Sequence, residues 1–251
     1  AFYDVTAKGL RVLVSGLEMR LENAYREMSS QNWSTWGSVG EESPYVRSMH
    51  DAILPFATTV QSLLPPSYFK NFCDKFATAF TSTYYTALIR LKRISELGTQ
   101  QLLLDVYNLK TLMLKLPVIK KAADEKKQQQ APSLSSHPAI PPAMYTKIIS
   151  KEFSKMEILL KLVGTPSDQL VEMFRAYWPD GSGADLQTVM GLKGTHRKEQ
   201  QVILDQLGLD KGMSGVVDAV LGERGGAVVD KVSGDLSTMR QKVDDFRKAF
   251  R

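Results

Sequence analysis

Histidine and cysteine, the residue types that most often carry chemistry, are few and widely spaced in this chain. The three histidines stand far apart, at His50, His137 and His196. Zinc needs three or four converging ligands, and no histidine has other potential ligands at metal spacing, so we expect no metal site. Cys73 lies between Phe72 and Phe76 without a histidine placed to activate it. This setting predicts a buried structural thiol rather than a nucleophile.

Glycine-rich stretches offer no better site for catalysis or a cofactor. "WPDGSGADL" suggests a calcium loop, but placing Gly181 at the sixth loop position puts Ala176 first and Trp178 third, where carboxylates are needed. "GERGG" and "GDLST" lack the lysine and hydroxyl pattern of a phosphate-binding loop. The chain has neither a G-x-S-x-G elbow nor a metalloprotease His-Glu pair. The sequence therefore predicts no catalytic residues, no cofactor and no enzyme.

Lysine is the one charged residue type that is concentrated in one part of the sequence. Ten lysines against five carboxylates stand between residues 105 and 161, and this excess of five equals the net charge of +5 of the whole chain. Lys147, Lys151 and Lys155 recur every four residues and Lys161 follows, so much of one helix face is basic. Such a face is either an ordinary solvated surface or a docking strip for an acidic partner or an anionic lipid surface.

The elements that carry these residues follow from apolar side chains at steps of three and four. This spacing predicts helices over residues 5–30, 44–64, 65–94, 99–116, 145–163, 167–178, 185–190 and 195–208, with weaker helices beyond. We expect a kink or break at Pro55, stops at Pro117 and at Gly164 with Pro166, and N-caps at Ser167 and Thr195. Sustained two-residue alternation is absent, so the fold class is all-α.

The stretch "TQQLLLDVYNLKTLMLKLP" has an apolar face too wide for a two-stranded seam, which favours a bundle, and we place Gln101 and Asp105 on its other faces. Residues 118–144, rich in Lys, Gln, Pro and Ser, read as a flexible linker. We therefore expect a first helix bundle over residues 1–117 and a second over 145–251. No apolar run is long enough to span a bilayer.

Bulk properties set the remaining bounds. A single cysteine excludes an internal disulfide framework and favours a reducing compartment. The first residues have neither an initiator methionine nor a signal segment, which suggests a piece of a longer chain. The mild positive charge does not indicate a nucleic-acid binder.

Three separated segments, in order, carry a family resemblance: "GTQQLLLDVYNLKTLMLKLP", "YTKIISKEFSKMEILLKLVGTPSDQLVEMF" and "LKGTHRKEQQVILDQL". Over roughly residues 66–207 the chain resembles the C-terminal region of the family of vacuolar protein sorting-associated protein 53. The resemblance implies a subunit of the GARP tethering complex and of its endosomal relative EARP, and a helical rod of consecutive bundles in the CATCHR tether class. It offers no catalytic residues.

The resemblance also implies a peripheral protein on the cytoplasmic face of the trans-Golgi network and endosomes, acting in retrograde vesicle transport. Implied partners are other GARP or EARP subunits, bound through coiled coils missing here, and vesicle or Golgi membrane proteins such as SNAREs or small GTPases. The projecting end would then lie in this region.

Our expected partner-binding residues are Lys147, Lys151, Lys155, Lys161, Lys193, Arg197 and Glu199. The alternative is a peripheral membrane-binding module that uses the basic helix face and the amphipathic C-terminal "LSTMRQKVDDFRKAFR". It differs by predicting steep salt dependence and a preference for anionic lipid without a protein partner.

Overall fold

The computed structural model describes residues 2–119 and 140–208, and these form helices without any strand. The elements are α1 (Phe2–Ser30), η1 (Trp33–Thr35), α2 (Pro44–Leu63), α3 (Pro66–Ile89), α4 (Glu96–Lys115), η2 (Leu116–Val118), α6 (Ala143–Gly164), α7 (Leu170–Tyr177) and α8 (Gly183–Lys193). One more helix covers residues 197–208. The all-α prediction is confirmed for this part of the chain.

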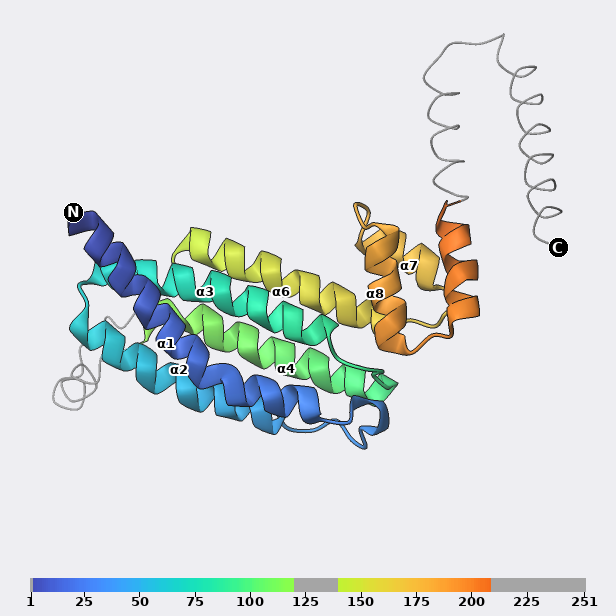
Figure 1. The fold of residues 1–251 in the computed structure, drawn as a ribbon, viewed down its shortest axis with the longest axis horizontal. Coiled ribbons are helices and arrows are strands. Elements are labelled where there is room, and N and C mark those ends of the chain that lie inside the picture. Colours follow the sequence, from blue (N-terminus) through green and yellow to red (C-terminus); the bar gives the residue numbers. More distant parts are fainter. Residues whose placement is uncertain (1, 120–139, 209–251) are drawn as a thin grey trace, which may run out of the picture. The chain divides into compact units, whose positions relative to one another are not determined.

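Residues 1–200 form one compact unit, and a second unit begins at residue 201. In the first unit α1 packs on α2 and α3, α4 packs on α2 and α6, and α3 also contacts α6 (Figure 1). α7 and α8 lie against α6. Within the described ranges, no helix is both long and apolar enough to cross a membrane.

The observed boundary between compact units differs from the predicted one. We expected the chain to divide at residues 118–144, but α6 packs along α4 within the first unit. The Tyr145 hydroxyl donates to the Met113 carbonyl at 2.8 Å, and Lys110 Nζ lies 2.8 Å from a Glu157 carboxylate oxygen. The wide apolar face of α4 needs this neighbour to be buried. Most of the expected linker and the part of the expected second bundle beyond residue 208 lie outside the described residues.

A row of neighbouring aromatic rings runs along the buried face of α3. Phe69, Phe72, Phe76, Phe80 and Tyr84 follow one another with ring centroids 5.8 to 6.2 Å apart. Their spacing of three or four residues puts them on one helix face. All five side chains are buried, so this row forms the centre of the first unit.

Several predicted element ends are confirmed. α4 ends at Lys115 and tightens into η2, where Pro117 prevents continuation. Its start was not predicted: α4 begins three residues before the expected 99, after Ser95, whose hydroxyl accepts from the Gly98 N–H at 3.1 Å. α6 ends at Gly164, two residues before Pro166. Pro55, by contrast, lies inside α2, which continues to Leu63. Of the predicted kink or break at Pro55, the break is therefore wrong.

Other ends were placed incorrectly. α3 stops at Ile89 rather than at residue 94, and Leu91 and Ile94 are buried in the loop that follows. The Ile94 N–H donates to the Leu192 carbonyl at 2.8 Å. α7 follows Gln169, so Ser167 does not cap it. The helix over residues 197–208 likewise starts beyond the expected cap at Thr195. Apolar spacing marks burial in loops as well as in helices, which explains the longer prediction for α3.

Candidate functional site

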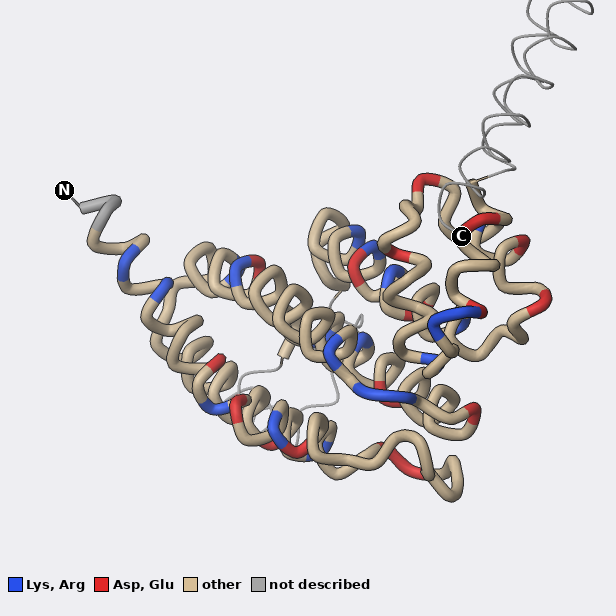
Figure 2. Tube along the Cα trace, turned by 45° about the vertical axis from the view of Figure 1, so that its right-hand side comes forward, with Lys and Arg blue, Asp and Glu red and all other residues tan. Residues whose placement is uncertain are grey.

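The exposed lysines of α6 form the candidate docking surface. Tyr145, Ile149, Phe153 and Met156 are buried on the opposite side of the helix. The helical period therefore turns the lysines outward, and all four expected side chains are exposed: Lys147, Lys151, Lys155 and Lys161. Figure 2 marks the charged positions along the trace.

These four lysines do not lie in one row. Lys155 lines a groove between α3 and α6, and Lys151, one turn earlier, lies on the same side of α6. Lys161 follows Glu157 by four residues, and the Glu157 carboxylate pairs with Lys110 of α4. At about 100° per residue, Lys147 lies between Lys151 and Lys161 around the helix, with Lys155 toward α3 and Lys161 toward α4.

The α3–α6 groove has a volume of about 530 Å³. Thr81 and Tyr85 of α3, Ile148 of α6 and Trp178 after α7 line it, beside Lys155. Its wall therefore offers aromatic and aliphatic contacts beside Lys155 and its ion-pair partner Glu152, which also lines the groove. Burial raises the pKa of the Tyr85 hydroxyl, and the nearby Asp185 carboxylate raises it further, so Tyr85 is a neutral donor at physiological pH.

Ion pairs within the chain use only part of the basic surface. Lys155 Nζ lies 2.8 Å from a Glu152 carboxylate oxygen, with 48% and 33% of the two side chains exposed. Solvent screens such a pair, so it contributes little to stability. In the residues that the structure describes, neither Lys147 nor Lys151 forms an ion pair. The same holds for Lys161, so Lys147, Lys151 and Lys161 are available to an outside partner.

Lys193 has a different position from the one expected for a docking residue. Its ammonium donates to the carbonyls of Val163 at 3.2 Å and Thr165 at 2.6 Å, at the end of α6. Partial burial lowers the pKa of Lys193, and the Glu199 carboxylate acts in the opposite direction. A lysine at the carbonyl end of a helix satisfies acceptors that have no intrahelical partner. Lys193 therefore joins α8 to the end of α6.

Arg197 and Glu199, the remaining expected site residues, are exposed on the helix over residues 197–208. The preceding turn is set by Gly194, which has φ of 72° and ends α8 in the left-handed conformation. A Cβ at Gly194 would lie 2.7 Å from Arg93 Cδ. Conformation and space both favour glycine here.

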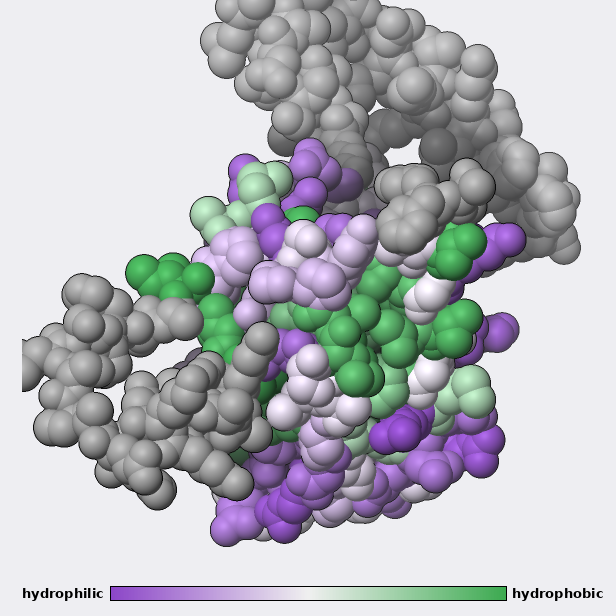
Figure 3. Space-filling view, turned by 90° about the vertical axis from the view of Figure 1, so that its left-hand side faces the viewer, coloured by the Kyte–Doolittle hydropathy of each residue, from purple (hydrophilic) through white to green (hydrophobic). Residues whose placement is uncertain are grey.

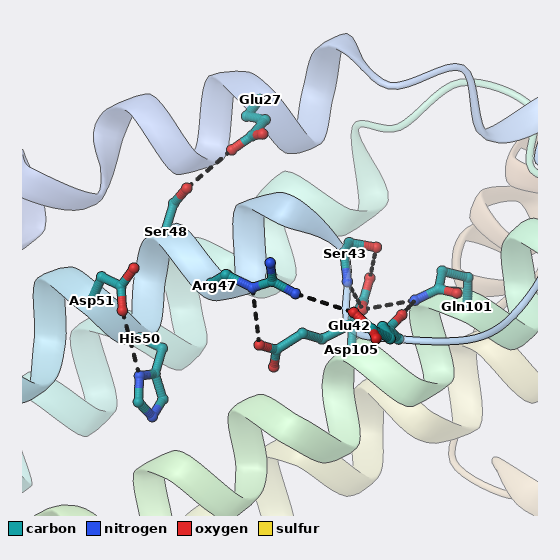
Figure 4. A network of polar contacts seen from close by, with 10 residues as sticks. Glu27, Glu42, Ser43, Arg47, Ser48, His50, Asp51, Gln101 and Asp105 are labelled. Carbon is teal, nitrogen blue, oxygen red and sulfur yellow. Dashed lines mark hydrogen bonds and ion pairs between the residues drawn. The ribbon is translucent and has the colours of Figure 1, made fainter.

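A buried polar network around Asp105 escaped sequence reasoning (Figure 4). Asp105 and Gln101 are buried, although their polarity suggested exposed faces of α4. The Asp105 carboxylate accepts from the Ser43 N–H at 2.9 Å, the Ser43 hydroxyl at 2.6 Å and the Tyr45 hydroxyl at 3.0 Å. Tyr45 also shares a hydrogen bond of 2.9 Å with the hydroxyl of Tyr84.

These hydrogen bonds hold the start of α2 against α4. Burial raises the pKa of Asp105, while hydrogen bonds from Ser43, Gln101 and Tyr45 act to lower it. The Asp105 side chain is 0% exposed, so no substrate in solution reaches it. The network therefore holds helices together rather than carrying out chemistry.

The remaining reactive residue types have ordinary surroundings. Cys73 is fully buried, as predicted, and burial raises the pKa of its thiol to about 12. His50 and His196 are exposed, while His137 lies outside the described residues. Across residues 2–119 and 140–208, no three His, Cys, Asp or Glu side chains come together to hold a metal ion.

Comparison with known proteins gives one consistent result. The family described as the C-terminus of vacuolar protein sorting-associated protein 53 matches residues 100–195. The chain is 33% identical over 204 residues to vacuolar protein sorting-associated protein 53 A of Arabidopsis thaliana, covering 81% of this chain and 23% of that protein. It is 30% identical over 244 residues to the Caenorhabditis elegans homolog, covering 95% of this chain and 28% of that protein.

The chain thus spans about a quarter of the length of these two relatives. A third relative, protein 53 B of Arabidopsis thaliana, is 30% identical over 111 residues, which are 44% of this chain and 18% of that protein. No solved structure matches.

Proposed function

We propose, from the premise that the chain belongs to the vacuolar protein sorting-associated protein 53 family, that it is part of a non-enzymatic subunit of a vesicle tether. The complex would be GARP or EARP, acting in transport from endosomes to the trans-Golgi network. The subunit would lie at the cytoplasmic face of these membranes as a peripheral protein, and other tether subunits would bind regions outside this chain.

The role of this region is to present a docking surface to an acidic protein on the vesicle or Golgi membrane, such as a SNARE or a small GTPase. One observation supports this most: Lys147 and Lys151, which have no ionic partner among the described residues, precede Lys155 on α6 by two turns and one turn, and Lys155 lines the groove together with Ile148. Interfaces combine apolar anchors with a charged rim. Lys161, Arg197 and Glu199 are exposed candidates for the same role, whereas Lys193 is left out because α6 uses its ammonium.

A charge reversal in the full-length subunit tests this proposal. Lys151→Glu with Lys155→Glu should reduce cargo retrieval in cells, because both changes place negative charge where the acidic partner binds. The matched control is Arg90→Glu with Lys92→Glu, which makes the same change of charge at two exposed positions after α3. Normal retrieval by the first variant, with the complex assembled, would remove this surface from consideration.

A further inference from the structure

Four helix ends meet at one end of the first unit. The Gln61 amide near the end of α2 donates to the Ile119 carbonyl after α4 at 2.7 Å. A small groove of about 180 Å³ lies beside it, lined by Leu64, Pro66, Phe69, Pro117 and Pro142 among others. The groove thus joins the end of α2, the start of α3, the end of α4 and the start of α6. We call this region, residues 61–70, 115–119 and 140–147, the bundle tip.

The bundle tip exposes large apolar side chains. Leu63 is 75% exposed, Ile140 is 86% exposed and Met144 is 70% exposed. Figure 3 looks onto this end of the molecule and shows apolar residues gathered over much of it. Single exposed apolar residues are common on proteins, but a contiguous group marks an interaction site.

Charge at the bundle tip has one sign. The segments 54–73, 106–119 and 140–151 contain five lysines and neither aspartate nor glutamate. Lys110 pairs with Glu157, whereas exposed Lys70, Lys115 and Lys147 form no ion pair with a described residue. Three chain segments distant in sequence thus bring lysines without carboxylates around an apolar centre.

We propose that the bundle tip binds the surface of an anionic lipid bilayer. Leu63, Ile140 and Met144 enter the interface between headgroups and acyl chains, and the lysines contact lipid phosphates and carboxylates. Apolar insertion combined with basic residues is the pattern of reversible membrane binding. The charge complementarity is direct, because no carboxylate in these three segments opposes an anionic headgroup.

The shape of the tip favours a bilayer over a protein helix as the occupant. Leu63 ends α2, Met144 lies in the first turn of α6 and Ile140 precedes α6, and none of them lines the adjoining groove of about 180 Å³, which is too small to seat a helix. This surface uses neither the C-terminal segment beyond residue 208 nor Lys155 and Lys193. It shares Lys147 with the proposed docking surface, but it does not rest on the proposed tether role, because flotation measures lipid binding alone and cargo retrieval is tested with Lys151 and Lys155.

Flotation of the 251-residue chain with lipid vesicles tests the proposal. The vesicles contain phosphatidylcholine alone or phosphatidylcholine with phosphatidylserine, at low and high salt. We expect binding only with phosphatidylserine, weakened by salt because screening shortens the range of the attraction. Lys70→Glu, Lys115→Glu and Lys147→Glu together should lower partitioning by at least about a hundredfold, since each lysine contributes roughly a fivefold factor.

The apolar part has its own variant, Leu63→Asn with Ile140→Asn and Met144→Asn, which should also abolish flotation. Two control variants should float like the wild type. The charge control combines Arg90→Glu, Lys92→Glu and Arg93→Glu, and the apolar control combines Val12→Asn, Met19→Asn and Tyr107→Asn, all at exposed positions elsewhere. Circular dichroism confirms that each variant keeps its helices.

Three results would overturn the proposal. The first is a wild-type chain that does not float with phosphatidylserine vesicles. The second is an equal loss of flotation in the control variants. The third is a dimer in light scattering that the apolar tip variant converts to a monomer, because a second copy of the chain would then cover the tip.

Discussion

At the residue scale, Asp105 shows how a buried carboxylate can connect two helices through hydrogen bonds. Its carboxylate accepts from the backbone N–H of Ser43, the residue before α2, and from two hydroxyls. A carboxylate at the start of a helix also meets the positive end of the helix dipole. Burial nevertheless dominates and raises the pKa of Asp105.

The raised pKa of Asp105 predicts a pH-dependent contribution to stability. A carboxyl group whose pKa is higher in the folded than in the unfolded protein stabilises most below its unfolded value, near 3.9, and loses this stabilisation as pH rises through the folded pKa. The free energy of unfolding of wild type minus that of Asp105→Asn should therefore decrease as pH rises from about 4. Urea titrations at several pH values measure it, and an increase with pH would contradict the assignment.

Gly98 offers a second test at this scale, with a matched control. A Cβ at Gly98 would lie 2.5 Å from the Trp33 carbonyl oxygen, whereas a Cβ at Gly16 in α1 meets no atom within 4 Å. Gly98→Ala should lower the free energy of unfolding, because a backbone atom must move. Gly16→Ala should raise it by about 0.5 to 1 kcal/mol, because alanine favours the helix. Thermal melts compare the two, and equal shifts would argue against close packing of α4 on the Trp33 loop.

At the scale of the elements, the row of rings on α3 predicts where truncation is most costly. Phe72 stacks on Phe69 and Phe76 and lies 6.2 Å, between ring centroids, from Phe56 of α2. Phe72→Ala should lower the free energy of unfolding by about 3 to 5 kcal/mol. Thr83→Ala, at an exposed position of the same helix, should change it by less than about 0.5 kcal/mol. Urea denaturation distinguishes the two, and a small loss at Phe72 would mean that the row is not the core.

Helices and their buried faces could be predicted from sequence because apolar spacing directly reflects burial on one side. The same spacing predicted too long a helix for α3, because Leu91 and Ile94 are buried although they lie in the loop after it. Asp105 could not be placed, because its burial depends on donors from Ser43 and Tyr45, some sixty residues away. Local pattern carries no information about such distant partners.

The candidate surfaces show the same limit. The exposed lysines of α6 followed from their four-residue spacing, but the position of Lys193 depends on the carbonyls that end α6. The lysines of the bundle tip are visible in the sequence as three segments without carboxylates. Only the packing of α2, α3, α4 and α6 brings those segments together.

At the scale of the whole molecule, the central point is that α6 belongs to the same compact unit as α1 to α4. Both proposed surfaces depend on this packing, because the α3–α6 groove and the bundle tip exist only where α6 lies against its neighbours. Two bundles divided at residues 118–144 would have neither surface.

Unfolding of the first unit tests this packing most directly. In a Trp178→Phe background the fluorescence comes from Trp33 and Trp36, next to the α1–α2 connection. Phe153 is buried on α6, and Phe153→Ala should shift the urea midpoint reported by these distant tryptophans, because cooperative units unfold together. A single transition at lower urea is the result we predict. An unchanged midpoint at Trp33 and Trp36 would show that α6 folds separately, contrary to the packing described.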